Sequence, residues 1–96
     1  MAYTIQKQQN GDRGRYVIAL DGGDEAEMTF VHVGSVMRIT HTGVPEQYEG
    51  HGVGRALLDR AIADARAEGF KILPACSYVM VQFKRHAEEW ADVLAT

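Results

Sequence analysis

Apolar and polar residues alternate in part of the first half of the chain, in the pattern typical of β-strands. The clearest case is AEMTFVHV, residues 26–33, where Met28, Phe30 and His32 fall on one side of an extended chain. The residues between them fall on the other side. A period of two predicts a strand.

Turn sequences divide this half of the chain into further strands. NGDRG, DGGDE and the pair Gly34-Ser35 interrupt the pattern, and the Asn10-Gly11 pair favours the positive backbone dihedrals of a tight hairpin turn. The last predicted strand is rich in β-branched residues and ends near Pro45, which cannot easily continue a central ladder. We therefore predict a four-strand meander over residues 3–8, 15–20, 26–33 and 36–44.

The pattern changes to that of a helix from Gly52 to Glu68. Charged residues occupy one side of this segment, and Gly69 supplies a left-handed C-terminal cap. The apolar residues fall on the opposite arc, as expected at a period of 3.6: Leu57, Leu58, Ala61, Ile62 and Ala65.

The remainder predicts one strand and two helical pieces. FKIL, residues 70–73, is a fifth strand ended by Pro74, and two short helices follow from about Ser77, broken near Arg85-His86. The order of four strands, helix, strand and helix indicates an α+β fold in which helices cover a mostly antiparallel sheet. A length of 96 residues supports a single domain over residues 1–96.

Composition restricts the class of protein. Hydrophobic residues make up 46% and charged residues 24%, and no stretch approaches the roughly 20 apolar residues of a membrane span. The N-terminus lacks the features of a signal peptide, so we expect a cytoplasmic protein. The single cysteine excludes an intramolecular disulfide, and no histidine or cysteine has metal-ligand spacing with another. A net charge of -3 argues against a nucleic-acid surface.

Three glycines at the start of the predicted helix suggest an anion site. A strand ending in THTGVP is followed by a short loop and then by Gly50, Gly52 and Gly54. The first amides of a helix lack intrahelical partners and lie at its positive end, and glycine lets a phosphate approach them closely. A sharp turn with no ligand would use the same residues.

Two common nucleotide motifs do not fit this segment. A Walker loop needs a Lys-Ser or Lys-Thr pair after the last glycine, but Arg55 follows Gly54. A Rossmann fingerprint follows the first strand of a parallel unit, whereas a meander comes first here. The remaining common ligand for a strand, loop and helix in such a sheet is the pyrophosphate of coenzyme A.

The segment HTGVPEQYEGHGVGRALLDRAIADARAEGFKILPACSYV resembles the GNAT superfamily of N-acetyltransferases. It is most similar to the small, stand-alone members of about 100 residues that carry the motifs hTxVP, GxGxG and PxCsyV. The resemblance covers most of the chain and implies that acetyl-CoA, or coenzyme A itself, is the cofactor. In one departure, Glu49 occupies a position where the superfamily usually has glutamine or arginine.

The resemblance also implies which residues bind coenzyme A. The strand through Thr42 and Val44 would separate from its neighbour and pair with the pantetheine arm, while Lys84 and Arg85 would meet the outlying phosphate. A solvated helix face explains these two cations equally well. The full set of cofactor-binding residues is Thr42, Gly43, Val44, Gly50, His51, Gly52, Val53, Gly54, Arg55, Lys84 and Arg85.

Three residues are candidates for the chemistry of acetyl transfer. Cys76 precedes a helix, whose positive terminus would lower the pKa of a thiol, so it could accept the acetyl group or merely line the site. Tyr78 could protonate the leaving thiolate, although a tyrosine in an apolar helix is usually part of the core. His41 could take a proton from the amine, or be an ordinary solvent-facing histidine.

These features lead to an acetyl-CoA-dependent N-acetyltransferase that acts on a primary amine, either a small molecule or a protein lysine. Transfer could be direct or could pass through an acetyl group on Cys76. The main alternative is a non-catalytic module that binds coenzyme A or a protein partner, and a small α+β protein without a cofactor is the third. We expect neither nucleic acid nor membrane as a partner.

Overall fold

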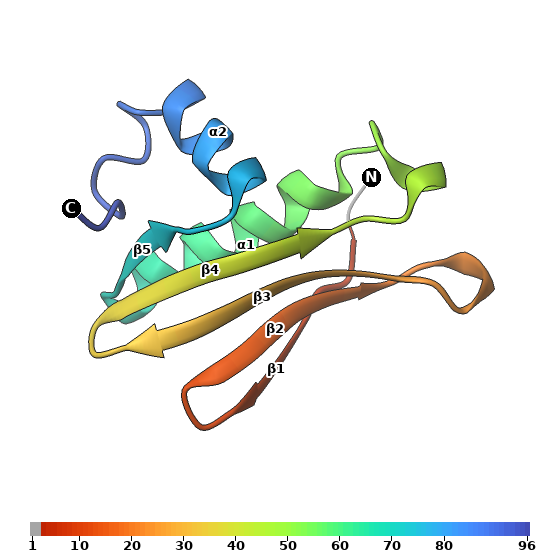
Figure 1. Ribbon diagram of the computed structural model, residues 1–96, viewed down its shortest axis with the longest axis horizontal. Helices are drawn as coiled ribbons and strands as arrows, with labels where there is room; N and C mark the ends of the chain where they lie inside the picture. The colour runs from red at the N-terminus through yellow and green to blue at the C-terminus, as the bar shows by residue number, and fades with distance from the viewer. Residues whose placement is uncertain (1–2) are drawn as a thin grey trace.

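The computed structural model describes residues 3–96 and contains a five-stranded sheet in the order β1-β2-β3-β4-β5 (Figure 1). The first four strands pair antiparallel in sequence order, and β5 pairs parallel to β4. The predicted α+β fold with a four-strand meander is confirmed. The elements are β1 (Gln6–Asn10), β2 (Arg13–Ala19), η1 (Asp21–Gly23), β3 (Glu25–Val33), β4 (Val36–Gly43), η2 (Glu46–Tyr48), α1 (Val53–Glu68), β5 (Lys71–Pro74) and α2 (Ser77–Arg85).

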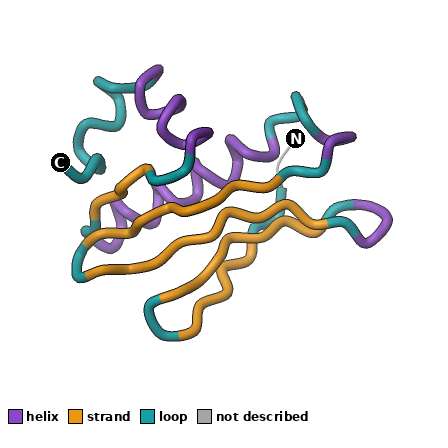
Figure 2. The backbone as a smooth tube through the Cα atoms, viewed as in Figure 1, coloured by secondary structure: helices purple, strands orange, loops and turns teal. Residues whose placement is uncertain are grey.

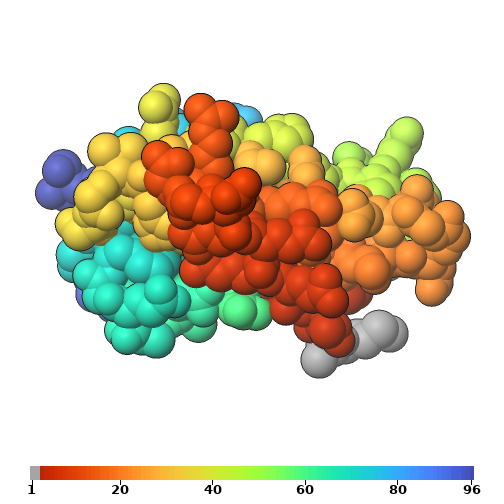
Figure 3. Space-filling view, turned by 90° about the horizontal axis from the view of Figure 1, so that it is seen from below, coloured from red at the N-terminus to blue at the C-terminus, as the bar shows by residue number. Residues whose placement is uncertain are grey.

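The first hairpin turn is centred one residue later than the sequence suggested. Asn10 pairs with Arg13, so Gly11 and Asp12 are the central residues. Gly11 has φ 66° and Asp12 has a negative φ, which is the pattern of a type II′ turn with glycine first. Figure 3 shows this hairpin at the surface, with the last turn of α1 beside it.

Helix α1 covers one face of the sheet and packs against β2, β3 and β5 (Figure 1). Its predicted apolar arc, including Leu57 and Leu58, is buried against Met28 and Phe30 of β3. Helix α2 packs against β4 and β5. Neither helix of residues 3–96 has the length and apolar character needed to cross a membrane.

The prediction of a second helical piece after Arg85 is wrong. Helix α2 ends at Arg85, and the chain then passes through turns back to β5, where Leu94 forms a parallel bridge with Ile72 (Figure 2). The amide of Ile72 donates to the carbonyl of Val93 at 2.7 Å, and the amide of Ala95 donates to that of Ile72 at 2.8 Å. These bonds partner the outer edge of β5, which favours an extended end over a helix.

Candidate active site

The site begins where β4 and β5 separate. Their pairing ends at Ile39 and Pro74, and one further bond joins the amide of Ala75 to the carbonyl of Ile39 at 3.0 Å. Beyond this point the chain turns into α2, while β4 continues to Gly43 (Figure 1). The outer edge of β4 over its last residues therefore has no neighbouring strand within residues 3–96. The resemblance implied this separation.

A cleft of about 590 Å³ lies beside this free edge. It lies between the end of β4, the loop that carries the glycines, and the first turns of both helices. Most of the predicted cofactor-binding residues line it, and Tyr48 is a lining residue that the sequence did not suggest. The lining residues are Thr42, Gly43, Val44, Tyr48, Glu49, Gly50, Gly52, Val53, Gly54, Arg55 and Tyr78.

The start of α1 presents free amides to the cleft. Gly52 is the N-cap residue, with φ 78°, and it has no side chain to cap the helix. Within residues 3–96, the amides of residues 53–55 donate no hydrogen bond, since the first bond of the helix runs from Ala56 to Gly52, and the first turn contains no acidic residue. This donor set fits an anion such as a diphosphate. The amide of His51 is excluded from it, because it donates to the carbonyl of Tyr48 at 3.2 Å.

Tyr78 packs on the backbone of this first turn. A methyl group on Gly54 would lie 3.2 Å from both the Cζ atom and the hydroxyl of Tyr78, so glycine allows the ring to approach the helix. Burial raises the pKa of the Tyr78 hydroxyl, and the positive charge of Arg55 acts in the opposite direction. The net shift is upward, so at neutral pH the hydroxyl is protonated and can donate a proton into the cleft.

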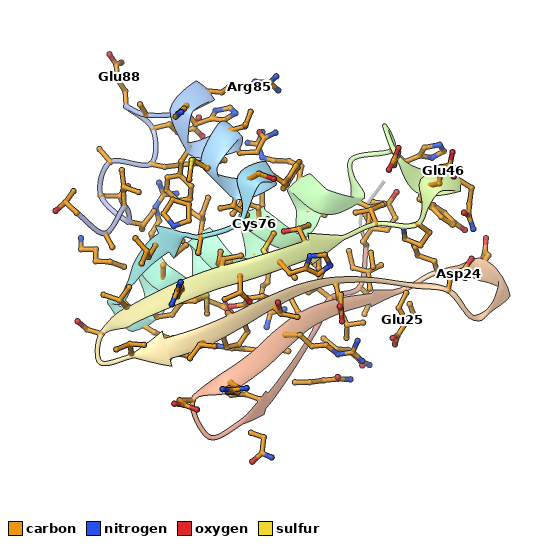
Figure 4. The ribbon with its side chains drawn as sticks, in the orientation of Figure 1. Asp24, Glu25, Glu46, Cys76, Arg85 and Glu88 are labelled. Atoms are coloured by element: carbon orange, nitrogen blue, oxygen red, sulfur yellow. The ribbon has the colours of Figure 1, made fainter. Side chains whose placement is uncertain are left out.

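Cys76 is not among the residues that line the cleft. Figure 4 shows it where the chain enters α2. It is the N-cap residue of α2, and its Sγ atom is 3.5 Å from Oγ1 of Thr42, which does line the cleft. Burial acts to raise the pKa of the thiol. Hydrogen bonds from the amides of Val79, Tyr78 and Thr42 and from the hydroxyl of Thr42 together outweigh burial, so the pKa is lower than that of an ordinary thiol.

A β-bulge determines where His41 points. The pairing changes between Phe30 with Ile39 and Thr29 with His41, which leaves Thr40 as an extra residue in β4. Thr42 therefore pairs with the buried Met28 and faces the helices, whereas His41 faces the opposite side of the sheet. The structure thus does not bring His41 into the cleft. No signal in the local sequence indicated the bulge.

His41 nevertheless lies near the end of the free edge. A methyl group on Gly43 would be 3.1 Å from its Nε2 atom and 4.0 Å from Cγ of Glu27. On this same face, a depression of about 530 Å³ is lined by Gly23, Asp24, Glu25, Glu27, Gly43 and Val44. Gly43 and Val44 thus belong to both the cleft and this acidic depression.

The two predicted cations on α2 are not at the cleft. Lys84 and Arg85 are exposed, and Figure 4 shows Arg85 at the far end of the helix from Cys76. The basic side chain in the lining is that of Arg55. Within residues 3–96, no group of three histidine, cysteine or acidic residues is arranged to hold a metal ion.

Comparisons with known proteins agree with this geometry. Residues 15–93 match the family model described as GCN5-related N-acetyl-transferase. Protein NATD1 of Gallus gallus is 27% identical over 84 residues, which cover 85% of this chain and 76% of that protein. The NMR solution structure of a GCN5-like protein from Staphylococcus aureus matches with a TM-score of 0.71 and 28% identity, covering 94% of this chain and 87% of the other.

Proposed function

Because the chain belongs to the GCN5-related N-acetyltransferase family and is an acyltransferase, we propose that it uses acetyl-CoA to acetylate a primary amine. One observation supports acetyl-CoA as the acetyl donor. The uncapped amides at the start of α1 face a cleft, and the cleft lies beside the unpaired edge of β4. When bound, acetyl-CoA supplies an acetyl thioester.

The chain provides two kinds of backbone contact for this donor. The amides of residues 53–55 bind the diphosphate, and the positive φ angles of Gly50 and Gly52, 82° and 78°, set the path of the loop that exposes them. The free edge of β4 at Thr42 and Val44 pairs with the amides of the pantetheine arm, as an added strand would.

The opposite face of the sheet suits the amine. The depression there is lined by the carboxylates of Asp24, Glu25 and Glu27. Arg15 already pairs with Glu25 at 3.3 Å and with Glu27 at 2.9 Å. One guanidinium group does not balance three carboxylates, so the remaining negative charge favours a cationic acceptor. His41 faces the same side, and an imidazole can take the proton that a primary ammonium must lose before attack. Tyr78, on the cleft side, donates a proton to the leaving thiolate.

Cys76 could enter the reaction in one of two ways. Its lowered pKa favours a thiolate that attacks the thioester carbonyl, with cleavage of the bond to the sulfur of coenzyme A. Its position next to Thr42 and outside the lining instead favours direct transfer to the amine, with Cys76 supporting the wall of the cleft. Both routes give the same product and differ in where label accumulates.

Labelled acetyl-CoA separates these routes. The protein is incubated with it, with and without spermidine or a lysine peptide, and the products are mapped by mass spectrometry. Label on Cys76 that moves to the amine supports the acetyl-enzyme, and label on the amine alone, retained in Cys76→Ala, supports direct transfer. Binding of coenzyme A without label on any acceptor would instead support a binding module. Glu49 in the cleft and the absence of a clear general base among the described residues that line it both favour that alternative.

A further inference from the structure

Arg55 is the basic side chain that lines the cleft, and its guanidinium group is held on three sides. Its Nε atom donates to Oδ1 of Asp59 at 2.8 Å. Its Nη1 atom is 3.2 Å from Nε2 of His86, and its Cζ atom lies 5.0 Å from the centre of the Trp90 ring. The side chain is 38% exposed, so it is fixed at the surface of the cleft rather than buried.

These contacts leave one end of the guanidinium free. Nε and Nη1 are occupied, whereas the two hydrogens on Nη2 have no acceptor within residues 3–96. Arg55 belongs to the same first turn whose amides are uncapped. A planar cation with free donors beside unpaired amides suits the oxygens of a diphosphate.

His86 is itself fixed in orientation. Its Nδ1 atom lies 3.1 Å from Oε1 of Glu89, and its ring stacks on Trp90 with centroids 4.5 Å apart. Trp90 is only 2% exposed and packs edge-on against Phe83. In the neutral ring with its proton on Nδ1, Nδ1 donates to Glu89 and Nε2 accepts from Arg55.

We propose that His86, stacked on Trp90, is a positioning residue that holds Arg55 in place to bind the diphosphate of coenzyme A. This inference rests on the proposed function, because it needs that ligand. It gives the segment after α2 a role in the site in addition to covering the edge of β5. Fixing the guanidinium before binding removes the entropy cost of ordering a long side chain when the ligand arrives.

A double-mutant cycle tests the proposal. Dissociation constants for coenzyme A are measured by calorimetry for the wild type, Arg55→Ala, His86→Ala and the double variant. We expect each single change to weaken binding about tenfold, and the double variant to be no weaker than Arg55→Ala. Losses that multiply in the double variant would show that His86 acts independently of Arg55 and would overturn the proposal.

Three additional measurements separate positioning from stability. His86→Gln, whose amide oxygen can accept from Arg55, should restore binding to within about threefold, and exposed Glu88→Ala should leave it unchanged. Dephospho-CoA, which keeps the diphosphate, should show the same loss for His86→Ala. A loss restricted to coenzyme A would overturn the diphosphate assignment in favour of the outlying phosphate.

The outcomes also distinguish this inference from the proposed function. If the wild type binds neither coenzyme A nor dephospho-CoA, the proposed function fails and this inference fails with it. If the wild type binds but no coupling is found, only the positioning role fails. If thermal denaturation shows that His86→Ala does not fold, the cycle is repeated with His86→Gln and Arg55→Lys. Unchanged binding of coenzyme A in Arg55→Lys would then contradict the role of the guanidinium group.

Discussion

The hydroxyl of Thr42 is the side-chain group within hydrogen-bond distance of the Cys76 thiol. Hydrogen bonds to the charged form lower the pKa of a thiol, so removing one raises it. We expect the midpoint of the pH profile for alkylation by iodoacetamide to lie below 9.0, the ordinary thiol value, in the wild type. In Thr42→Val the midpoint should move upward, with slower alkylation at pH 7. An unchanged midpoint would mean that the hydroxyl does not stabilise the thiolate.

Gly54 combines a packing role and a helix position in one residue. In Gly54→Ala the new methyl group would press on the Tyr78 ring at 3.2 Å, while alanine favours the helix by up to about 1 kcal/mol. We expect an unchanged or higher melting temperature and a several-fold lower rate of acetyl transfer. In a Tyr78→Phe background the same change should have little further effect on the rate. An equal loss in both backgrounds would place the defect elsewhere.

At the scale of elements, Gly14 of β2 lies close to both neighbouring strands, β1 and β3. A methyl group there would lie 2.6 Å from both the carbonyl oxygen of Gln8 and Cζ of Phe30. We expect Gly14→Ala to lower the free energy of unfolding by about 1–3 kcal/mol in urea denaturation, as overpacking does. Phe30→Leu should recover part of this loss in the double variant, and a Gly14→Ala protein as stable as the wild type would contradict the close approach.

Most elements could be predicted from the sequence because their patterns are local. The buried residues of α1 from Leu57 to Ala65 repeat with the helical period, and the residues around Met28 alternate with the period of a strand. Gly69 indicates where the helix ends. The extended end at Leu94 could not be predicted in this way. Its apolar spacing suits a helix, and only the unpaired edge of β5, distant in sequence, favours a strand bridge.

The candidate site was predictable where it depends on backbone. The glycines and the end of β4 were identified because turns and helix termini have sequence signatures. The direction of His41 depends on a bulge at Thr40, and the partners of Arg55 lie about 30 residues away in His86 and Trp90. Such contacts arise from tertiary packing, which a single sequence does not display.

At the scale of the whole molecule, Tyr16 joins the sheet to α1. Its fully buried hydroxyl donates to Oδ2 of Asp64 at 2.7 Å, and burial followed by this hydrogen bond raises the pKa of Tyr16 strongly. Above pH 10, the ordinary tyrosine value, the unfolded chain loses this proton while the folded protein keeps it. Linkage then lowers the free energy of unfolding as pH rises.

Tyr16→Phe isolates this contribution. We expect the variant to be about 1 kcal/mol less stable at pH 7, because Asp64 loses a partner. Between pH 9 and 11, urea denaturation should show a smaller decline in stability for the variant than for the wild type. Parallel declines would indicate that other groups cause the alkaline loss.

The backbone at Gly43 and Val44 separates the cleft from the acidic depression, since both hollows include these residues. Two reactants that approach a strand from its two sides do not compete for the same volume. Direct transfer should accordingly give intersecting double-reciprocal lines, whereas an acetyl group on Cys76 would give parallel ones. In either case an inert amine should inhibit without displacing the thioester. A single molecule mimicking both reactants would have to pass through the gap between β4 and β5.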